Sequence, residues 1–181
     1  MVVGTLALGY CLAVFLDAKV YQASEAREFA RELRLQQQNK AAALSPIALV
    51  PKHGAVGKLE IPRIGVSVIV VEGADDSDLA RGAGHIPGTA LPWDSGNVGV
   101  AGHRDTFFRP LRSIQREDAI AMSTLHGEYR YRVVSTSIVG PEDTQVLYPT
   151  GRDSLTLVTC FPFDFIGSAP KRFIVRAERT Q

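Results

Sequence analysis

The chain has little cysteine and no excess of either charge, and these two absences exclude several classes of protein. Only Cys11 and Cys160 occur among its 181 residues. Two cysteines so far apart cannot supply a zinc framework, and no disulfide is expected because Cys11 lies in an apolar N-terminal run. The 20 Lys and Arg residues nearly balance the 19 Asp and Glu residues. The composition therefore indicates neither a nucleic-acid partner nor an acidic disordered tail.

Charge is also missing from residues 1–16, which are mostly apolar. This run is a little shorter than the about 20 residues that a membrane-spanning helix needs. Three interpretations compete: a transmembrane anchor whose start lies upstream of Met1, a signal peptide, and a core helix. No clear Ala-x-Ala site follows, which argues against cleavage. We expect an anchor over residues 1–16, but no Lys or Arg precedes the run to fix its orientation.

A polar helix follows and has no sustained apolar heptad. Glu28 attracts Arg31 but repels Glu32, so charge pairing contributes little to this helix. We expect a solvated spacer, with a partner-binding coiled coil as the alternative. Residues 45–57 contain prolines and a glycine that break the helix, and residues 17–55 are thus predicted to be a helical spacer and hinge.

Glycine and proline are frequent after about residue 45, as in a turn-rich β domain. We expect one such domain over residues 56–181. Residues 84–93 are predicted to be irregular, and short helical turns are predicted within residues 106–114 and 142–151. The predicted strands cover residues 56–61, 66–71, 97–103, 119–124, 129–139, 154–160 and 172–176. Seven or eight strands with little helix predict an all-β fold, either a closed barrel or a sandwich.

Four carboxylates, Glu72, Asp75, Asp76 and Asp78, surround the start of a short predicted helix. Asp75 or Asp76 would cap that helix, whose positive end favours the other carboxylates. A calcium site is the alternative interpretation of so many oxygens. Their spacing matches no EF-hand loop and the cap accounts for them, so we expect no cofactor.

Cys160 ends a predicted strand, because Pro162 removes a ladder donor just after it. An aromatic loop over residues 161–171 leads to the next strand, which begins near Arg172. If the two strands pair, a guanidinium lies close to the thiol. Alternation places two sets of side chains on opposite faces: Leu155, Leu157 and Thr159 on one, Thr156, Val158 and Cys160 on the other.

A thiol becomes a useful nucleophile beside a base, and histidine is the usual partner. His103 ends a strand as Cys160 does, and the small residues before it permit close approach. Considered alone, His103 is equally well explained as a strand-end histidine with structural partners. His53 and His126 are expected to be solvated. His85 either lines a groove or is an ordinary loop histidine.

Arg172 supplies a possible third part of the site. Acyl transfer builds negative charge on a carbonyl oxygen, and a fixed donor there lowers the barrier by roughly 3 to 4 kcal/mol. A guanidinium keeps its charge and carries five donors in a rigid fork. Considered alone, Arg172 would be interpreted as a surface strand arginine.

Three separated motifs resemble the sortases, the cysteine transpeptidases of bacterial cell surfaces. They are Ala101-Gly102-His103-Arg104, then Thr156-Leu157-Val158-Thr159-Cys160, then Arg172 after a short loop. Residues 84–90 and 104–111 look most like class D. The resemblance covers about residues 56–178 and is specific, because the motifs occur in the family's order with suitable spacing.

The resemblance implies an eight-stranded sortase-type β-barrel behind a single-pass membrane anchor, with the catalytic domain outside the cytoplasm. By analogy Cys160 attacks the bond after Thr in a Leu-Pro-x-Thr-Gly-like sorting signal. His103 would move protons, and Arg172 would hold the substrate carbonyl or oxyanion. The implied partners are a surface protein or pilin and an amine acceptor, either a peptidoglycan precursor or a lysine. Further substrate-binding candidates are Ala101, Thr159, His85, Phe161 and Phe163.

Other interpretations remain for the same residues. An L,D-transpeptidase-like acyltransferase would carry a Ser-x-Gly-Cys segment, which is missing, and a papain-like hydrolase would place the cysteine at the start of a long helix. A membrane-anchored adhesion or scaffold module would tolerate loss of Cys160. The aromatic loop over residues 161–171 either forms one wall of a peptide groove or packs over the barrel end.

Overall fold

Apolar side chains at alternate positions of the strands fill the interior of this barrel. A computed structural model describes residues 2–38 and 54–180. In β2 (Val66–Glu72), for example, Val66, Val68 and Val70 enter the core while Ser67 is exposed. Each strand thus gives one row of apolar side chains to the interior, as its period of two requires.

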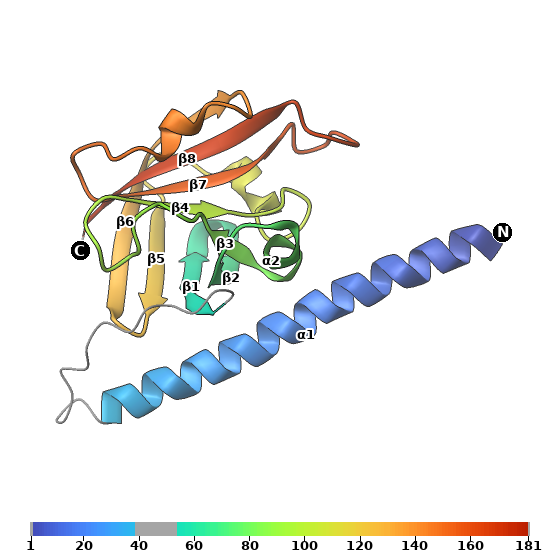
Figure 1. Ribbon diagram of the computed structural model, residues 1–181, viewed down its shortest axis with the longest axis horizontal. Coiled ribbons are helices and arrows are strands. Elements are labelled where there is room, and N and C mark those ends of the chain that lie inside the picture. Colours follow the sequence, from blue (N-terminus) through green and yellow to red (C-terminus); the bar gives the residue numbers. More distant parts are fainter. Residues whose placement is uncertain (1, 39–53, 181) are drawn as a thin grey trace.

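The described part of the chain forms one long helix and a closed barrel of eight strands (Figure 1). The sheet order is β1-β2-β3-β4-β7-β8-β6-β5. The strands are β1 (Ala55–Ile61), β2, β3 (Ala83–His85), β4 (Asn97–Ala101), β5 (Ala119–Thr124), β6 (Gly127–Val139), β7 (Ser154–Phe161) and β8 (Lys171–Arg179). The helices are α1 (Val2–Gln38) and α2 (Asp76–Arg81), with 3₁₀ turns η1 (Pro62–Ile64), η2 (Arg109–Ser113) and η3 (Thr144–Leu147).

Two of the strand pairings are parallel, and one of them brings together the strands that form the site. β2 pairs with β3, and β4 pairs with β7, in parallel, while the other neighbours are antiparallel. Strand β7 therefore lies between β4 and β8. The C-terminal ends of β4 and β7 and the start of β8 meet at one rim of the barrel.

The predicted strands are confirmed, and so is the closed barrel among the two expected architectures. One prediction was wrong: residues 84–93 are not all irregular, because Gly84 and His85 belong to β3. This strand is short and starts with small residues, so it has no alternating pattern to detect. Its backbone lies so close to its neighbour that a Cβ at Gly84 would stand 2.1 Å from the carbonyl oxygen of Gly73.

The acidic segment forms the predicted capped helix. Asp75 caps α2, and its carboxylate accepts hydrogen bonds from Ser77 and from the backbone N–H of Asp78. These bonds lower the pKa of Asp75 to about 2. Glu72 instead accepts from the His85 ring. Among the described residues no group of three or more metal-ligating side chains is arranged to hold an ion.

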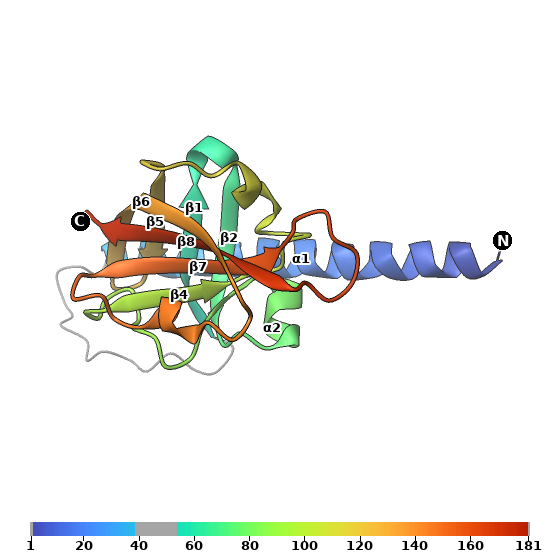
Figure 2. The ribbon, with the colours of Figure 1, turned by 90° about the horizontal axis from the view of Figure 1, so that it is seen from above.

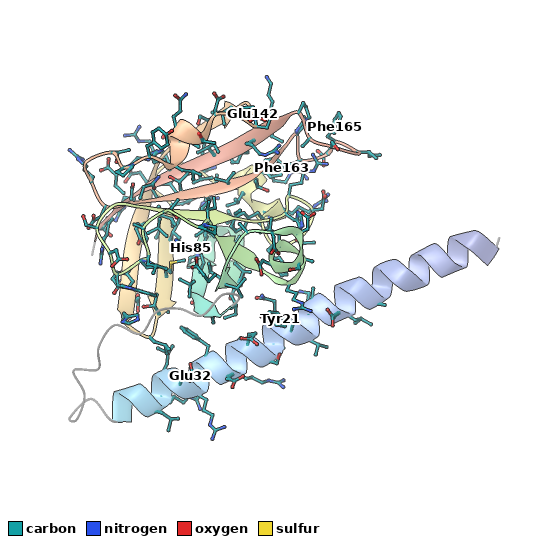
Figure 3. All side chains as sticks on the ribbon, in the orientation of Figure 1. Tyr21, Glu32, His85, Glu142, Phe163 and Phe165 are labelled. Atoms are coloured by element: carbon teal, nitrogen blue, oxygen red, sulfur yellow. The ribbon has the colours of Figure 1, made fainter. Side chains whose placement is uncertain are left out.

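Helix α1 lies against the outside of the barrel, so the predicted spacer is a helix but is not solvated all round. Phe29 is buried, and the Gln22 amide accepts from Ile69 N–H of β2 and donates to the Arg81 carbonyl of α2. Figure 3 shows Tyr21 on the side of α1 that faces the barrel.

Two predictions concern the N-terminal part, namely the membrane anchor and the hinge. No helix in residues 2–38 or 54–180 combines the length and the apolar character that crossing a membrane requires. Most of the predicted hinge, including His53, lies outside the described residues.

Candidate functional site

Cys160 and Arg172 are direct partners across two neighbouring strands. In the antiparallel pairing of β7 with β8, the register sets Cys160 opposite Arg172. Side chains of directly opposed residues leave the sheet on the same face, with Cβ atoms about 5 Å apart. The strand pairing expected from sequence thus brings thiol and guanidinium to one place.

His103 reaches the same place through the parallel pairing of β4 with β7. The last paired residues are Ala101 and Val158, and the Gly102 N–H then donates to the Val158 carbonyl at 3.1 Å. Thr159 Oγ1 closes the junction by donating to the Gly102 carbonyl at 2.7 Å. His103 lies two residues after Ala101, as Cys160 lies two residues after Val158, so both residues stand at the same rim of the barrel.

We call Cys160, Arg172 and His103 the central row: the first two are paired across β7 and β8, and His103 lies two residues after the end of β4, which pairs with β7. Cys160, His103 and Arg172 are each partly exposed, and Cys160 is a free thiol. The next row along the same face consists of Ala101, Val158 and Ile174. The surface next to Cys160 is therefore formed by small and apolar side chains.

Within the described chain, the thiol and the imidazole form no hydrogen bond with each other. The Arg172 guanidinium donates through Nη1 to the carbonyls of Ala169 at 3.2 Å and Lys171 at 3.1 Å. Catalytic hydrogen bonds are often long in free enzymes and shorten when substrate binds. The thiol, the imidazole and the guanidinium thus lie at one rim of the barrel and form no hydrogen bonds with one another in the described part of the chain.

His85 lies apart from this row. It is 2% exposed, with Nδ1 2.7 Å from Glu72 Oε2 and Nε2 3.0 Å from both the Ala90 carbonyl and Thr89 Oγ1. Both ring nitrogens are thus occupied inside the protein, and the side chain does not open onto a groove. Of the two interpretations from sequence, the structure supports a histidine that holds the loop after β3.

Of the other substrate-binding candidates, some lie beside the central row and others are packed inside the protein. Ala101 stays partly exposed beside the central row. Thr159 shares a face with Leu155 and Leu157, as the alternation predicted, but it is 3% exposed and its hydroxyl bonds the Gly102 carbonyl, so it is not open to a substrate as expected. Phe163 is also buried, and its ring centroid lies 5.3 Å from that of Phe173 and 6.0 Å from that of Phe161. The base of the aromatic loop therefore packs over the barrel end.

A polar cluster below the row was not predicted. The Val146 carbonyl of η3 accepts hydrogen bonds from Asn97 Nδ2, Thr156 Oγ1 and Arg176 Nη2, the last at 2.5 Å. Burial lowers the pKa of Arg176. The cluster fixes η3 over the outer face of β4 and β7, so the loop between β6 and β7 borders the row. Such cross-strand polar contacts form only once the strands are paired, and the sequence gives no signal for them.

Arg104 is the other residue whose role the sequence did not reveal. It stands next to His103 in a quoted motif, yet its guanidinium is buried and bonds the backbone of residues 162–170, here called the β7–β8 loop. Its partners are backbone carbonyls about sixty positions away, and these leave no trace in residue types.

Comparison with known proteins agrees with this geometry. A sequence model described as the Sortase domain matches residues 59–180. Sortase D of Bacillus subtilis is 38% identical over 131 residues, which are 71% of this chain and 66% of that protein. Sortase A of Bacillus anthracis is 26% identical over 135 residues, 72% of this chain and 62% of that protein. The chain thus spans just under two thirds of these relatives.

Solved structures with the same fold cover most of the chain. A Clostridium perfringens sortase D5 transpeptidase superposes with a TM-score of 0.75 at 26% identity, covering 90% of this chain and 99% of its own. Sortase C-1 of Actinomyces oris gives a TM-score of 0.66 at 28% identity, covering 86% and 99%. By domain match, sequence identity and barrel fold together, the chain belongs to the sortase family.

Proposed function

We propose that this protein is a cysteine transpeptidase that cleaves a Leu-Pro-x-Thr-Gly-like sorting signal after Thr and transfers the acyl part to an amine. The observation that carries the proposal is the register itself. Cys160 stands opposite Arg172 and beside β4, which ends two residues before His103, at one rim of a sortase barrel.

In the first half of the reaction, the Cys160 thiolate attacks the carbonyl carbon of the Thr residue. The carbon–nitrogen bond of the Thr–Gly peptide then breaks, and His103 gives a proton to the leaving amine. The product is a thioester between the substrate Thr and Sγ of Cys160. A thiolate is the reactive form of cysteine, and an adjacent histidine is its usual activating partner.

In the second half, an acceptor amine attacks the thioester carbonyl. His103 takes the proton that this amine loses, the carbon–sulfur bond breaks, and the Cys160 thiolate is regenerated. The amide that forms replaces the amide that broke, so no oxidant, reductant or cofactor enters the balance. Both halves pass through an oxyanion next to Cys160.

Arg172 is suited to hold that oxyanion. Its position opposite Cys160 brings a permanent cation with several fixed donors to the reacting carbonyl. Donors aimed at developing negative charge commonly account for about 100-fold to 1,000-fold in rate. To engage a substrate, Arg172 presents the N–H groups that do not bond Ala169 and Lys171, or leaves these two carbonyls.

The partners proposed are a surface protein or pilin that carries the sorting signal, and a peptidoglycan precursor or a lysine as the amine. We further propose a cell-membrane location with the barrel outside the cytoplasm, because this is where such substrates occur. The uncharged and mostly apolar residues 1–16 support an anchor at that end of the chain.

The direct test incubates the full chain with a quenched Leu-Pro-x-Thr-Gly peptide, with and without an added amine. We expect cleavage in both cases and a peptide–amine conjugate only with the amine. Cys160→Ala is expected to abolish both products while the barrel stays folded. Cleavage that persists in Cys160→Ala would show that another residue is the nucleophile.

A further inference from the structure

The β7–β8 loop is exposed over most of its length, and one buried arginine makes most of its hydrogen bonds to the rest of the protein. Its residues 164–168 are all exposed, and Ile166 is 97% exposed. Only Phe163 anchors the start of the loop in the barrel end. In Figures 1 and 2 the loop projects from the barrel beyond the ends of β7 and β8. A segment with so few buried contacts is expected to open easily unless specific hydrogen bonds close it.

Arg104 supplies those hydrogen bonds. Its Nη1 donates to the Pro162 carbonyl at 3.0 Å, and its Nη2 donates to the carbonyls of Phe165 at 2.6 Å and Gly167 at 3.0 Å. The guanidinium carbon also lies 5.9 Å from the centroid of the Phe165 ring, and Figure 3 shows Phe165 near the tip of the loop. One side chain therefore holds both arms of the loop.

The burial of Arg104 makes these bonds stronger than ordinary surface contacts. Its side chain is 7% exposed, and Asp105, the carboxylate that pairs with it in residues 2–38 and 54–180, lies at 3.5 Å and is 65% exposed. Most of the compensation for the buried charge thus comes from the loop carbonyls. Hydrogen bonds to charged groups are among the stronger ones in proteins, and a guanidinium fork fits several acceptors at once.

The base from which Arg104 extends is rigid. The Phe108 N–H donates to the His103 carbonyl at 3.1 Å, and Phe108 is fully buried. Gly102 packs so tightly on Phe108 that a Cβ there would lie 2.6 Å from the ring. The turn that follows His103 is thus fixed to the core. The hydrogen bonds of Arg104 hold the loop after Cys160 in place relative to this turn.

The β7–β8 loop lies between Cys160 and Arg172 in the sequence. Its first residue is two positions after Cys160, and its last part carries Ala169, whose carbonyl accepts from Arg172. We infer that Arg104 is a positioning residue, which holds the β7–β8 loop so that Cys160 and Arg172 keep their places relative to His103. The catalytic consequence rests on the proposed function, whereas the structural one does not.

A second arginine that contacts the same loop provides a matched control. Arg112 of η2 bonds Asp164 at 2.6 Å, but the two side chains are 41% and 68% exposed. Exposed ion pairs of this kind contribute little, because water screens them and both side chains lose freedom. The Arg112 guanidinium carbon also lies 6.0 Å from the centroid of the Phe163 ring. Arg112→Met therefore removes the exposed ion pair with the loop and keeps an apolar side chain next to that ring.

The test compares the full chain with Arg104→Met, Arg104→Lys and Arg112→Met. Hydrogen exchange followed by mass spectrometry is measured for peptides covering residues 162–170 and, as a reference, for peptides of β5 and β6. We expect Arg104→Met to speed exchange in the loop at least tenfold and in the reference strands less than twofold. Arg104→Lys should give an intermediate rate, because it keeps the charge but loses the fork. Arg112→Met should match the wild type.

Peptide turnover then separates positioning from mere stability. We expect kcat to fall at least tenfold in Arg104→Met with a smaller change in KM, and to recover partly in Arg104→Lys. Unchanged loop exchange, faster exchange in loop and strands alike, or a loosened loop with normal turnover would each overturn the inference. If the wild type does not cleave the sorting peptide, the proposed function fails, and loop exchange alone decides whether Arg104 holds the loop.

Discussion

Among single residues, Arg172 best separates a role that needs the geometry of the guanidinium from a role that needs only its positive charge. We predict that Arg172→Lys lowers kcat about 100-fold or more, because an ammonium keeps the charge but lacks the fork that reaches the oxyanion. Turnover of a sorting peptide measures this. The control is Arg152→Lys, an exposed arginine bonded to Glu178. Near-normal turnover of Arg172→Lys would remove this residue from the mechanism.

The approach of Cys160 to Arg172 could be predicted from the strand patterns, whereas His103 and Arg172 were singled out only in combination with Cys160. Cys160 and Arg172 flank a loop between two strand patterns, and His103 ends a third pattern. His85 shows the limit of this reasoning. A histidine in a Gly/Pro-rich loop is typical of a groove as well as of a buried anchor, and only the position of Glu72 across β2 and β3 decides between them.

Asp118 joins two elements and gives the chain a predictable response to acid. Its carboxylate is 6% exposed and accepts hydrogen bonds from Arg63 of η1 and from the Gln115 N–H. The bond from Arg63, more than any other contact, lowers the pKa of Asp118 below its ordinary value of 3.8. A carboxylate with a lowered pKa in the folded state adds stability above its unfolded pKa and loses it as pH falls through the folded pKa.

We therefore predict that Asp118→Asn lowers the free energy of unfolding at pH 7 by about 1 to 3 kcal/mol, through loss of charge-assisted hydrogen bonds. The difference from wild type should shrink as the pH falls below about 4. Urea unfolding at several pH values measures both effects, with the exposed Asp94→Asn as control. A difference that stays constant down to pH 2 would contradict the assignment.

The docked face of α1 is a second element-level feature. Phe29 is 4% exposed against the barrel, and a Cβ at Gly82 would lie 2.7 Å from Gln22 Nε2, so the helix approaches α2 closely. The sequence could not show this contact, because a single phenylalanine and a glutamine make no apolar stripe. The polar composition after residue 16 predicted the helix itself, because helix formation depends on local propensity.

We predict that Phe29→Ala releases this face of α1. Loss of a buried phenylalanine weakens the contact by roughly 2 kcal/mol, so hydrogen exchange around residues 20–33 should speed by more than tenfold. Exchange in the barrel strands should stay near wild type. Leu35→Ala is the matched control, since Leu35 is 48% exposed on the same helix. Equal exchange in both variants would mean that Phe29 does not hold the helix.

On the scale of the whole molecule, the barrel brings together chemistry that lies far apart in sequence. His103 and Cys160 come to the same rim because β4 and β7 are parallel neighbours in the sheet. In the sequence, β5 and β6 separate these two strands. Strand pattern predicted the pieces of this arrangement. The parallel order itself is a long-range property, and the sequence indicated it only through resemblance to a family whose fold is known.

The most direct test of the account is to trap the acyl intermediate. The full chain is mixed with a Leu-Pro-x-Thr-Gly-like peptide in the absence of an amine acceptor, quenched in acid, digested and analysed by mass spectrometry. A nucleophilic Cys160 predicts a thioester to the Thr carbonyl on the fragment that contains Cys160, and its loss on addition of an amine. Peptide cleavage with no adduct on that fragment, or with the adduct on Cys11, would contradict the account.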